Sequence, residues 1–213
     1  INSSYITRGY KMKILAIDTS SDFISLAVLE DNQVLGFVEE QMQRGQAEML
    51  MPMIDTLLKK QNLKMKNIEA IAATVGPGSF TGVRIGLATA RAFGLALNIP
   101  VWGVTCFEAW AYHTAKPCKV VLDSKRDDYF VQAFDGAGKA QSAPALESTD
   151  ALKAQLPFAA IGTAADALHD EIGCEVIQKS LPLAAAVGQI AFARKATPVP
   201  PEPVYLREAD VTI

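Results

Sequence analysis

Hydrophobic positions in the first half of the chain fall into short runs that are separated by polar turns. Three runs follow one another at 12–21, 23–30 and 32–41, and their lengths are typical of strands. We therefore predict that the fold begins with a three-stranded meander. The next four elements alternate between helical spacing and buried strands: a helix over 46–60, a strand over 68–76, a long helix ending at Asn98 and a strand over 99–105.

The second half begins near Thr105 and mixes helices and strands in a less regular order. The predicted elements are a helix at 106–114, two strands within 118–139, a helix at 148–156, a strand at 158–162 and helices at 163–172 and 181–196. The end of the chain is rich in proline, so we expect it to be extended. Residues 1–11 precede the pattern, and we expect a vector-derived tag or an upstream extension there.

Composition narrows the class of protein. Half of the 213 residues are hydrophobic and the formal net charge is -3. Lys and Arg form no dense run, so the sequence does not favour direct binding of nucleic acid, and any role on RNA is expected to involve a partner. The cysteines Cys106, Cys118 and Cys174 form no CxxC pair, which fits a reducing cytoplasm. No apolar run reaches the roughly 18 residues of a membrane span.

A glycine-rich loop, ATVGPGSFTG at 73–82, joins a predicted strand to the long helix. The backbone N–H groups of Gly76 and Gly78 could hold a phosphate at the helix N-terminus. The loop could equally be a tight turn whose helix is capped by Ser79 or Thr81. The Lys that ends a P-loop is missing here, and this favours the turn.

Asp18 ends the first predicted strand and is followed by Thr19 and Ser20. A carboxylate at this place can hold a magnesium-bound phosphate through water. It can also accept N–H groups of the next turn, as Asp, Thr and Ser commonly do. Both interpretations remain open, and these three residues form the candidate cofactor-binding set together with Gly76 and Gly78.

Two helices carry more apolar surface than one core requires. Small residues recur every four positions along the long helix, at Gly82, Gly86, Ala90 and Gly94. Each glycine weakens a helix by about 1 kcal/mol, so the close approach of a sheet or another helix is expected to compensate. The helix at 46–60 is apolar over roughly 200° of its wheel, although a stripe of roughly 100° suffices for one core.

We predict that these two helices lie side by side and present a shared apolar face to another subunit. The predicted contact residues are Met49, Leu50, Met53 and Leu57 of the first helix and Gly82, Gly86, Ala90 and Gly94 of the second. The alternative is that each helix is covered by its own core.

The sequence offers little catalytic chemistry. Its two histidines, His113 and His169, lack the paired spacing of a zinc site, and no GxSxG nucleophile elbow is present. The mixed-charge segment 123–128 has the composition of a solvated turn. We therefore predict no catalytic residue and no metal site.

Three segments resemble one known family in chain order: MKILAIDTS, TVGPGSFTGVRIGLATARAFGLAL and PVYLRE. They resemble the bacterial TsaB family, also called YeaZ, and the similarity runs from Met12 to the C-terminus. The resemblance implies an α/β fold of the actin, sugar-kinase and Hsp70 class (ASKHA), with two lobes that each contain a mixed sheet and flanking helices. The expected N-terminal lobe spans 12–104 and the smaller C-terminal lobe spans 105–213, with the helix at 181–196 packing back on the first lobe.

The resemblance also implies a role. Proteins of this family are expected to be non-catalytic subunits that pair with a TsaD-type catalytic paralogue and act with a TsaE-type ATPase. This machinery forms N6-threonylcarbamoyladenosine in tRNA, so tRNA is met indirectly. The two helices identified above would mediate pairing with the paralogue, or a homodimer when the chain is alone. The resemblance leaves open whether ATP or ADP with Mg²⁺ binds at a subunit boundary.

This sequence departs from the family pattern at three places. His113 stands alone where the paralogue would carry a pair of metal-binding histidines, and DTSS at 18–21 lacks the glycine of the fold's phosphate turn. Gln46 and Ala47 replace a His-Ser pair at the start of the first helix. The alternative function is a small ATP-binding or ATP-hydrolysing enzyme that uses Asp18 and the Gly76–Gly82 loop, and a metalloprotease is the least favoured.

Overall fold

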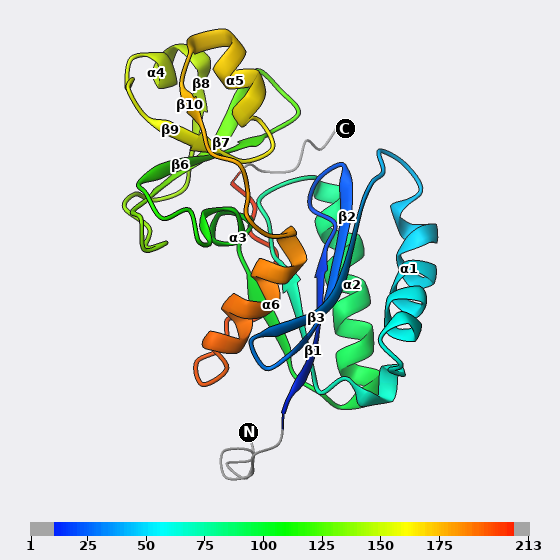
Figure 1. Ribbon diagram of the computed structural model, residues 1–213. Helices are drawn as coiled ribbons and strands as arrows, with labels where there is room; N and C mark the ends of the chain where they lie inside the picture. The colour runs from blue at the N-terminus through cyan, green and yellow to red at the C-terminus, as the bar shows by residue number, and fades with distance from the viewer. Residues whose placement is uncertain (1–10, 207–213) are drawn as a thin grey trace.

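The computed structural model describes residues 11–206, which form two lobes built on two five-stranded sheets (Figure 1). The predicted extension at 1–11 lies outside the described residues except for Lys11, and so does the end of PVYLRE. Within the described part of the chain, no helix is both apolar enough and long enough to span a membrane.

The first sheet has the order β3-β2-β1-β4-β5. Its strands are β1 (Lys13–Asp18), β2 (Phe23–Glu30), β3 (Gln33–Gln41), β4 (Ala70–Thr74) and β5 (Val101–Val104). The first three strands form the predicted antiparallel meander, while β4 pairs parallel to β1 and β5 pairs parallel to β4. The parallel pairs join strands through the crossover helices, and this brings the end of β1 beside the end of β4.

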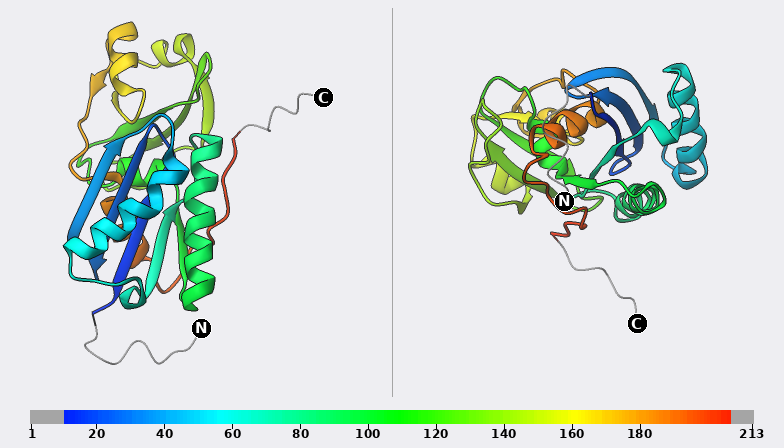
Figure 2. Two further views of the ribbon diagram at one scale, coloured as in Figure 1. Left: turned by 90° about the vertical axis from the view of Figure 1, so that its right-hand side faces the viewer. Right: turned by 90° about the horizontal axis from the view of Figure 1, so that it is seen from below.

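Helices cover both faces of the first sheet. Helices α1 (Gln46–Lys60) and α2 (Phe80–Leu97) lie on one face, and α6 (Leu183–Ala193) lies on the other. Figure 2 shows α1 and α2 side by side on their face of the sheet. Residues 14–17 of β1 are fully buried because helices cover them from both sides, and this explains their uninterrupted apolar sequence.

The second sheet has the order β10-β9-β6-β7-β8. Its strands are β6 (Cys118–Asp123), β7 (Asp128–Phe134), β8 (Ala145–Ser148), β9 (Ala159–Ile161) and β10 (Glu175–Val176). Helices α4 (Thr149–Lys153) and α5 (Ala165–Ile172) belong to this lobe, α3 (Cys106–Ala111) connects the two lobes, and a short 3₁₀ turn, η2, occupies Met65–Asn67.

The sequence analysis did not predict two strands of the second sheet, and it predicted two helices in the second half of the chain to be longer than they are. Strand β8 was not predicted, and β10 has only two residues, too few for any periodicity. The helix predicted at 106–114 ends at Ala111, and the one predicted at 148–156 spans only Thr149–Lys153. The remaining predicted helices and strands are present.

Candidate functional site

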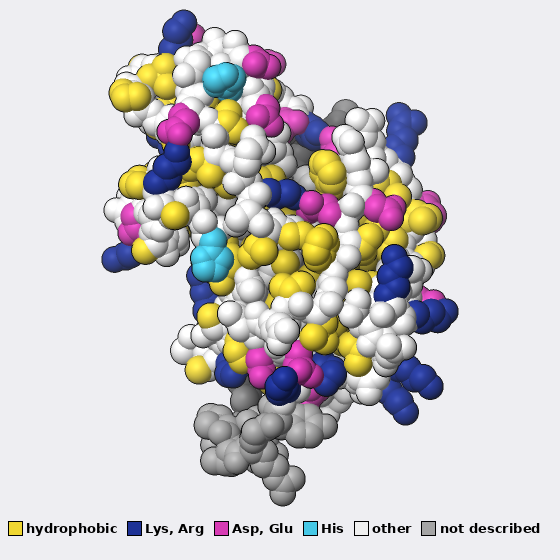
Figure 3. Space-filling model, viewed as in Figure 1, with side chains coloured by type: hydrophobic (Ala, Val, Ile, Leu, Met, Phe, Trp, Pro, Cys, Tyr) yellow, Lys and Arg dark blue, Asp and Glu magenta, His cyan; other side chains and the backbone are white. Residues whose placement is uncertain are grey.

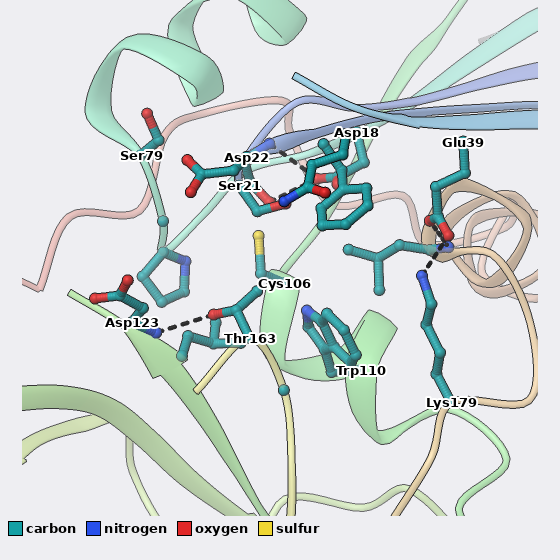
Figure 4. Close-up of a pocket in the computed structure, with 18 of the residues that line it drawn as sticks. Asp18, Ser21, Asp22, Glu39, Ser79, Cys106, Trp110, Asp123, Thr163 and Lys179 are labelled. Atoms are coloured by element: carbon teal, nitrogen blue, oxygen red, sulfur yellow. Dashed lines mark hydrogen bonds and ion pairs between the residues drawn. The ribbon is translucent and has the colours of Figure 1, made fainter. Parts of the chain in front are cut away.

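A cleft of about 340 Å³ lies between the two lobes (Figure 4). Turns at the ends of strands from both sheets line it. The first lobe contributes the β1–β2 turn, part of β3 and the loop before α2, while the second lobe contributes the β6–β7 turn and the start of α5. The cleft is the main candidate for a small-molecule site among the described residues.

Asp18 lies at the floor of the cleft and is 1% exposed. Its Oδ1 atom accepts three hydrogen bonds: from Ser20 N at 3.2 Å, from Ser20 Oγ at 2.6 Å and from Thr74 Oγ1 at 2.6 Å. Burial raises the pKa of the Asp18 carboxyl, although these hydrogen bonds act in the opposite direction. Asp18 therefore accepts donors from its own turn and from β4, which was the second of the two interpretations of its position.

The glycine-rich loop packs closely on its surroundings. A Cβ atom at Gly78 would lie 2.3 Å from Ser20 O, and Ser79 N donates to the same oxygen at 2.7 Å. Gly76 has a φ of +97°, and a Cβ atom there would lie 2.8 Å from Val204 O. The glycines are needed because other backbone segments approach the loop, and the hydroxyl of Ser79 accepts Gly82 N as the cap of α2.

The cleft brings together only part of the predicted cofactor-binding set. Asp18, Ser20 and Gly78 line it, whereas Thr19 and Gly76 are not among the lining residues. Thr19 instead packs against α2, where its Oγ1 atom donates to Gly82 O at 2.7 Å. Sequence reasoning also missed the aromatic residues Phe23 and Trp110 of the lining, because single aromatics in a strand and a short helix carry no spacing signal.

Cys106 lies at the base of the cleft and is 1% exposed. Figure 4 shows its sulfur pointing into the space beneath Asp18 and Ser21. Burial raises the pKa of the Cys106 thiol well above its ordinary value of 9.0, so the buried thiol stays protonated and unreactive. The sequence-based interpretation of this cysteine as a buried side chain is confirmed.

Both lysines that line the cleft form ion pairs with carboxylates of the lining. Lys125 contacts Asp22 at 2.8 Å and Asp123 at 3.1 Å, and Lys179 pairs with Glu39. Figure 3 shows charged side chains of both signs where the two lobes meet, above a cluster of hydrophobic ones on the first lobe. Within residues 11–206, no three side chains of His, Cys, Asp and Glu are placed to hold a metal ion.

The arrangement of these residues does not favour Mg²⁺ with a nucleotide phosphate, because within residues 11–206 no three acidic, His or Cys side chains come together as ligands. The Oδ1 atom of Asp18 is occupied by three donors, and Asp22 and Asp123 share one lysine. Lys125 and Lys179 each pair with a carboxylate in this structure.

Eight residues of the helix pair were predicted to contact a partner subunit. For seven of them the prediction is wrong, because they face the chain's own core. Leu50, Met53 and Leu57 pack beneath α1 with exposed fractions of 6% or less. The small residues of α2 are all buried against the sheet: Gly82, Gly86, Ala90 and Gly94. A Cβ atom would lie 2.0 Å from Thr19 O at Gly82 and 2.3 Å from Val101 Cγ2 at Gly94. The stripe therefore allows close approach of the sheet.

The two helices nevertheless present apolar side chains to solvent. Met49 and Met51 of α1 are 40% and 49% exposed, Phe80 is 41% exposed, and Leu95 of α2 is 87% exposed. Only Met49 belonged to the predicted contact set. We use the name outward face for the exposed apolar residues of α1 and α2 taken together, which are Met49, Met51, Phe80, Ala88, Ala92 and Leu95.

The segment before the described C-terminus extends along α2 (Figure 2). Gly103 N of the edge strand β5 donates to Val199 O at 2.8 Å, and Val204 N donates to Val75 O at 2.7 Å. Tyr205 reaches the start of α2, where its ring centroid lies 5.3 Å from that of Phe80. The segment thus covers the open edge of the first sheet and is extended, as its proline content predicted.

Comparisons with known proteins agree on one family. Residues 23–199 match the family model described as "TsaD: tRNA N6-adenosine threonylcarbamoyltransferase". An uncharacterised protein of Mycobacterium tuberculosis is 32% identical over 200 residues, which cover 92% of each chain. The Escherichia coli protein named "tRNA threonylcarbamoyladenosine biosynthesis protein TsaB" is 32% identical over 124 residues, which cover 56% of this chain and 53% of that protein. The alignments with proteins named TsaB thus span little more than half of their length.

Solved structures share the fold. The structure named "YeaZ from Pseudomonas aeruginosa" superimposes with a TM-score of 0.75 at 24% identity, covering 92% of this chain and all of the other. A Clostridium difficile dehydratase activator, solved with bound ADPNP, gives a TM-score of 0.55 at 11% identity over 87% of this chain and 96% of that one. These likenesses confirm the two-lobed ASKHA fold that the sequence resemblance implied.

Proposed function

The chain belongs to the TsaB/YeaZ family of tRNA threonylcarbamoyladenosine biosynthesis proteins, and on this premise we propose that it is a non-catalytic interaction subunit. It binds a TsaD-type catalytic subunit through the outward face of α1 and α2. A TsaE-type ATPase joins the assembly, and the partner subunits rather than this chain contact tRNA. When alone, the chain forms a homodimer. The compartment is the cytoplasm, in agreement with three free, buried cysteines.

The observation that carries this proposal is the outward face itself. Two neighbouring helices leave Met51 about half exposed and Leu95 almost fully exposed, while their inner faces already fill the core. Large apolar side chains left exposed on two neighbouring helices are typical of contact sites, and methionine adapts readily to a partner's shape. Charged residues at the ends of α1, such as Glu48 and Lys60, supply the polar rim that such interfaces have.

Nucleotide hydrolysis in the cleft is the alternative, and the arrangement of the cleft favours it less. Asp18 is buried and hydrogen-bonded within its own lobe, and both lysines of the cleft are paired with carboxylates. The Asp18→Asn variant separates the two functions, because it should abolish turnover in an enzyme and leave partner binding unchanged in an interaction subunit.

The test is size-exclusion chromatography with light scattering of this chain, with and without a purified TsaD-type subunit. We expect the mixture to elute as one peak whose mass equals the sum of one copy of each chain, and the chain alone to elute as a dimer. Two separate peaks at micromolar concentrations, with both proteins folded by circular dichroism, would contradict the proposal. Released phosphate is measured in parallel to detect hydrolysis of ATP by the chain alone.

A further inference from the structure

Two lysines tie the walls of the cleft together. Lys125 lies in the β6–β7 turn of the second lobe, and its ammonium contacts Asp22 in the β1–β2 turn of the first lobe at 2.8 Å. Lys179 lies in residues 177–182, the return segment by which the chain leaves the second lobe for α6, and it pairs with Glu39 of β3. Both lysines therefore attach a segment of the second lobe, or the segment leaving it, to the first lobe.

The backbone of its turn holds Lys125 in place. Lys125 has a φ of +62°, a conformation that non-glycine residues seldom adopt, and its N–H donates to Asp123 Oδ1 at 2.6 Å. Ser124 Oγ donates to Asp128 O at 2.7 Å and closes the same turn. The turn is thus fixed in the shape that extends the lysine toward Asp22.

Lys179 is held by more than its ion pair. Its ammonium lies 5.5 Å from the ring centroid of Trp110 and 6.0 Å from that of Phe23, so both rings face a cation. Glu39 also accepts Leu183 N at 3.3 Å, at the first residue of α6. Figure 4 shows Lys179 reaching Glu39 beside Trp110 at one side of the cleft.

We propose that the Lys125–Asp22 and Lys179–Glu39 ion pairs form a clasp that holds the cleft closed over Asp18 and Cys106, and that α1 and α2 set the position of the clasp. When the ion pairs separate, the lobes move apart and the floor of the cleft becomes accessible to solvent. The first part is independent of the proposed function. The second part rests on it, because it takes α1 and α2 as the helices to which the partner binds.

Both helices hold the turn that carries Asp22. Gln46, the first residue of α1, donates through Nε2 to Ser21 O at 2.8 Å and to Phe23 O at 3.3 Å, the two carbonyls that flank Asp22. On the other side of the turn, Thr19 Oγ1 donates to Gly82 O in α2. A partner that fixes α1 and α2 therefore fixes Asp22, and this keeps the clasp engaged.

The ion pairs of the clasp are weak enough to open and close reversibly. The Lys125 and Asp22 side chains are 55% and 36% exposed, and exposed ion pairs contribute little to stability. Breaking one such pair should raise the population of the open cleft by about 2- to 5-fold. Opening is therefore accessible under ordinary conditions and is sensitive to salt.

The thiol of Cys106 can be used to measure how often the cleft opens. In the background Cys118→Ala/Cys174→Ala it is the remaining thiol of the chain, and its rate of labelling by a maleimide measures access to the cleft floor. We expect Lys125→Ala to raise the rate by about 2- to 5-fold. Lys179→Ala should raise it by at least as much, because the Lys179–Glu39 pair is less exposed and Lys179 also contacts two aromatic rings, and the double variant should combine both effects. Lys59→Ala is the matched control, because Lys59 pairs with Asp55 within α1. It should leave the rate unchanged.

The charge-reversed pair Asp22→Lys/Lys125→Asp keeps the test decisive if the alanine variants unfold. It should label more slowly than Asp22→Lys alone, although not fully at the parent rate, because the carboxylate placed at position 125 lies near Asp123. An unchanged rate in a folded Lys125→Ala/Lys179→Ala variant would overturn the clasp. A labelling rate that follows global unfolding in urea would overturn it as well.

Adding the TsaD-type subunit tests the second part. We expect the complex to slow Cys106 labelling by at least about 2-fold in the parent, and Gln46→Ala to remove this effect while preserving co-elution. Co-elution with an unchanged labelling rate would overturn the link between helices and clasp but not the proposed function. Absence of co-elution would contradict the proposed function. The labelling rates of the lysine variants would then be the test of the clasp.

Discussion

Gly86 in α2 lies directly against Thr19 at the end of β1, and a Cβ atom at position 86 would lie 2.6 Å from Thr19 Oγ1. Thr19 cannot move aside freely, because the same Oγ1 atom donates to Gly82 O at 2.7 Å. The helix thus reaches the sheet only because position 86 has no side chain. Its neighbour Gly82 approaches Thr19 O in the same way.

Gly86→Ala should therefore destabilise the protein, although alanine is the better helix former by about 1 kcal/mol. Overpacking of this kind costs about 1–3 kcal/mol in the free energy of unfolding, which a urea titration measures. Ala92→Glu, on the exposed side of the same helix, is the control and should change stability by less than about 0.5 kcal/mol. A Gly86→Ala variant that is more stable than the parent would show that the sheet shifts to make room for the added methyl group.

The sequence predicted the elements of the first lobe better than the direction in which its helices face. An apolar arc of roughly 200° shows that a helix buries much of its surface, but it does not say which part faces the core. The stripe through Gly86 indicated a close approach of a sheet or another helix, and the sequence analysis assigned it to contact with another subunit. The structure assigns the stripe to the sheet and leaves Leu95 outside.

The cleft was predictable only in part for a related reason. Asp18 and Gly78 stood out because a carboxylate at a strand end and a glycine-rich loop are local signals. The pairing of Lys125 with Asp22 joins residues that are 103 positions apart, and no local pattern reveals it. The segment 123–128 was interpreted as a solvated turn, whereas its lysine lines the cleft and crosses it.

Met51→Glu and Leu95→Glu should prevent binding of a TsaD-type subunit without unfolding the chain. Both side chains point away from the core, so a charge costs little in the free chain but is buried without a partner in the complex. We expect each variant to weaken binding by at least about 10-fold, measured by calorimetry or co-elution.

Phe37→Glu is the matched control for these variants. Phe37 is 57% exposed in β3, where it pairs with Ala27 of the α6 side of the sheet, away from the outward face. It should bind as the parent does. Equal binding by all three variants would exclude the outward face as the contact surface.

Ser79→Ala should weaken the start of α2. Ser79 Oγ accepts the N–H of Gly82 at 3.2 Å, and loss of such a cap costs about 1 kcal/mol. Thr81, the other cap suggested by the sequence, lies within the helix and is exposed, so Thr81→Ala should change the free energy of unfolding by less than about 0.5 kcal/mol. Equal losses in the two variants would argue against the cap.

The buried carboxyl of Asp18 predicts a pH-dependent difference between the parent and the Asp18→Asn variant. Burial raises the pKa of Asp18 in the folded state above its ordinary value of 3.8, so the protonated carboxyl is the form that the fold favours. Its contribution to stability is fully present below pH 3.8 and is lost as the pH rises through the folded pKa.

The amide of the Asp18→Asn variant does not titrate, and it can still accept hydrogen bonds from Ser20 and Thr74. Between pH 3 and pH 7 the parent should therefore lose stability relative to this variant, by about 1.4 kcal/mol for each unit by which folding raises the pKa. Urea titrations at a series of pH values measure the difference. If the parent instead gains stability relative to the variant over this range, the three hydrogen bonds to Oδ1 outweigh burial and Asp18 is a charged group in the cleft.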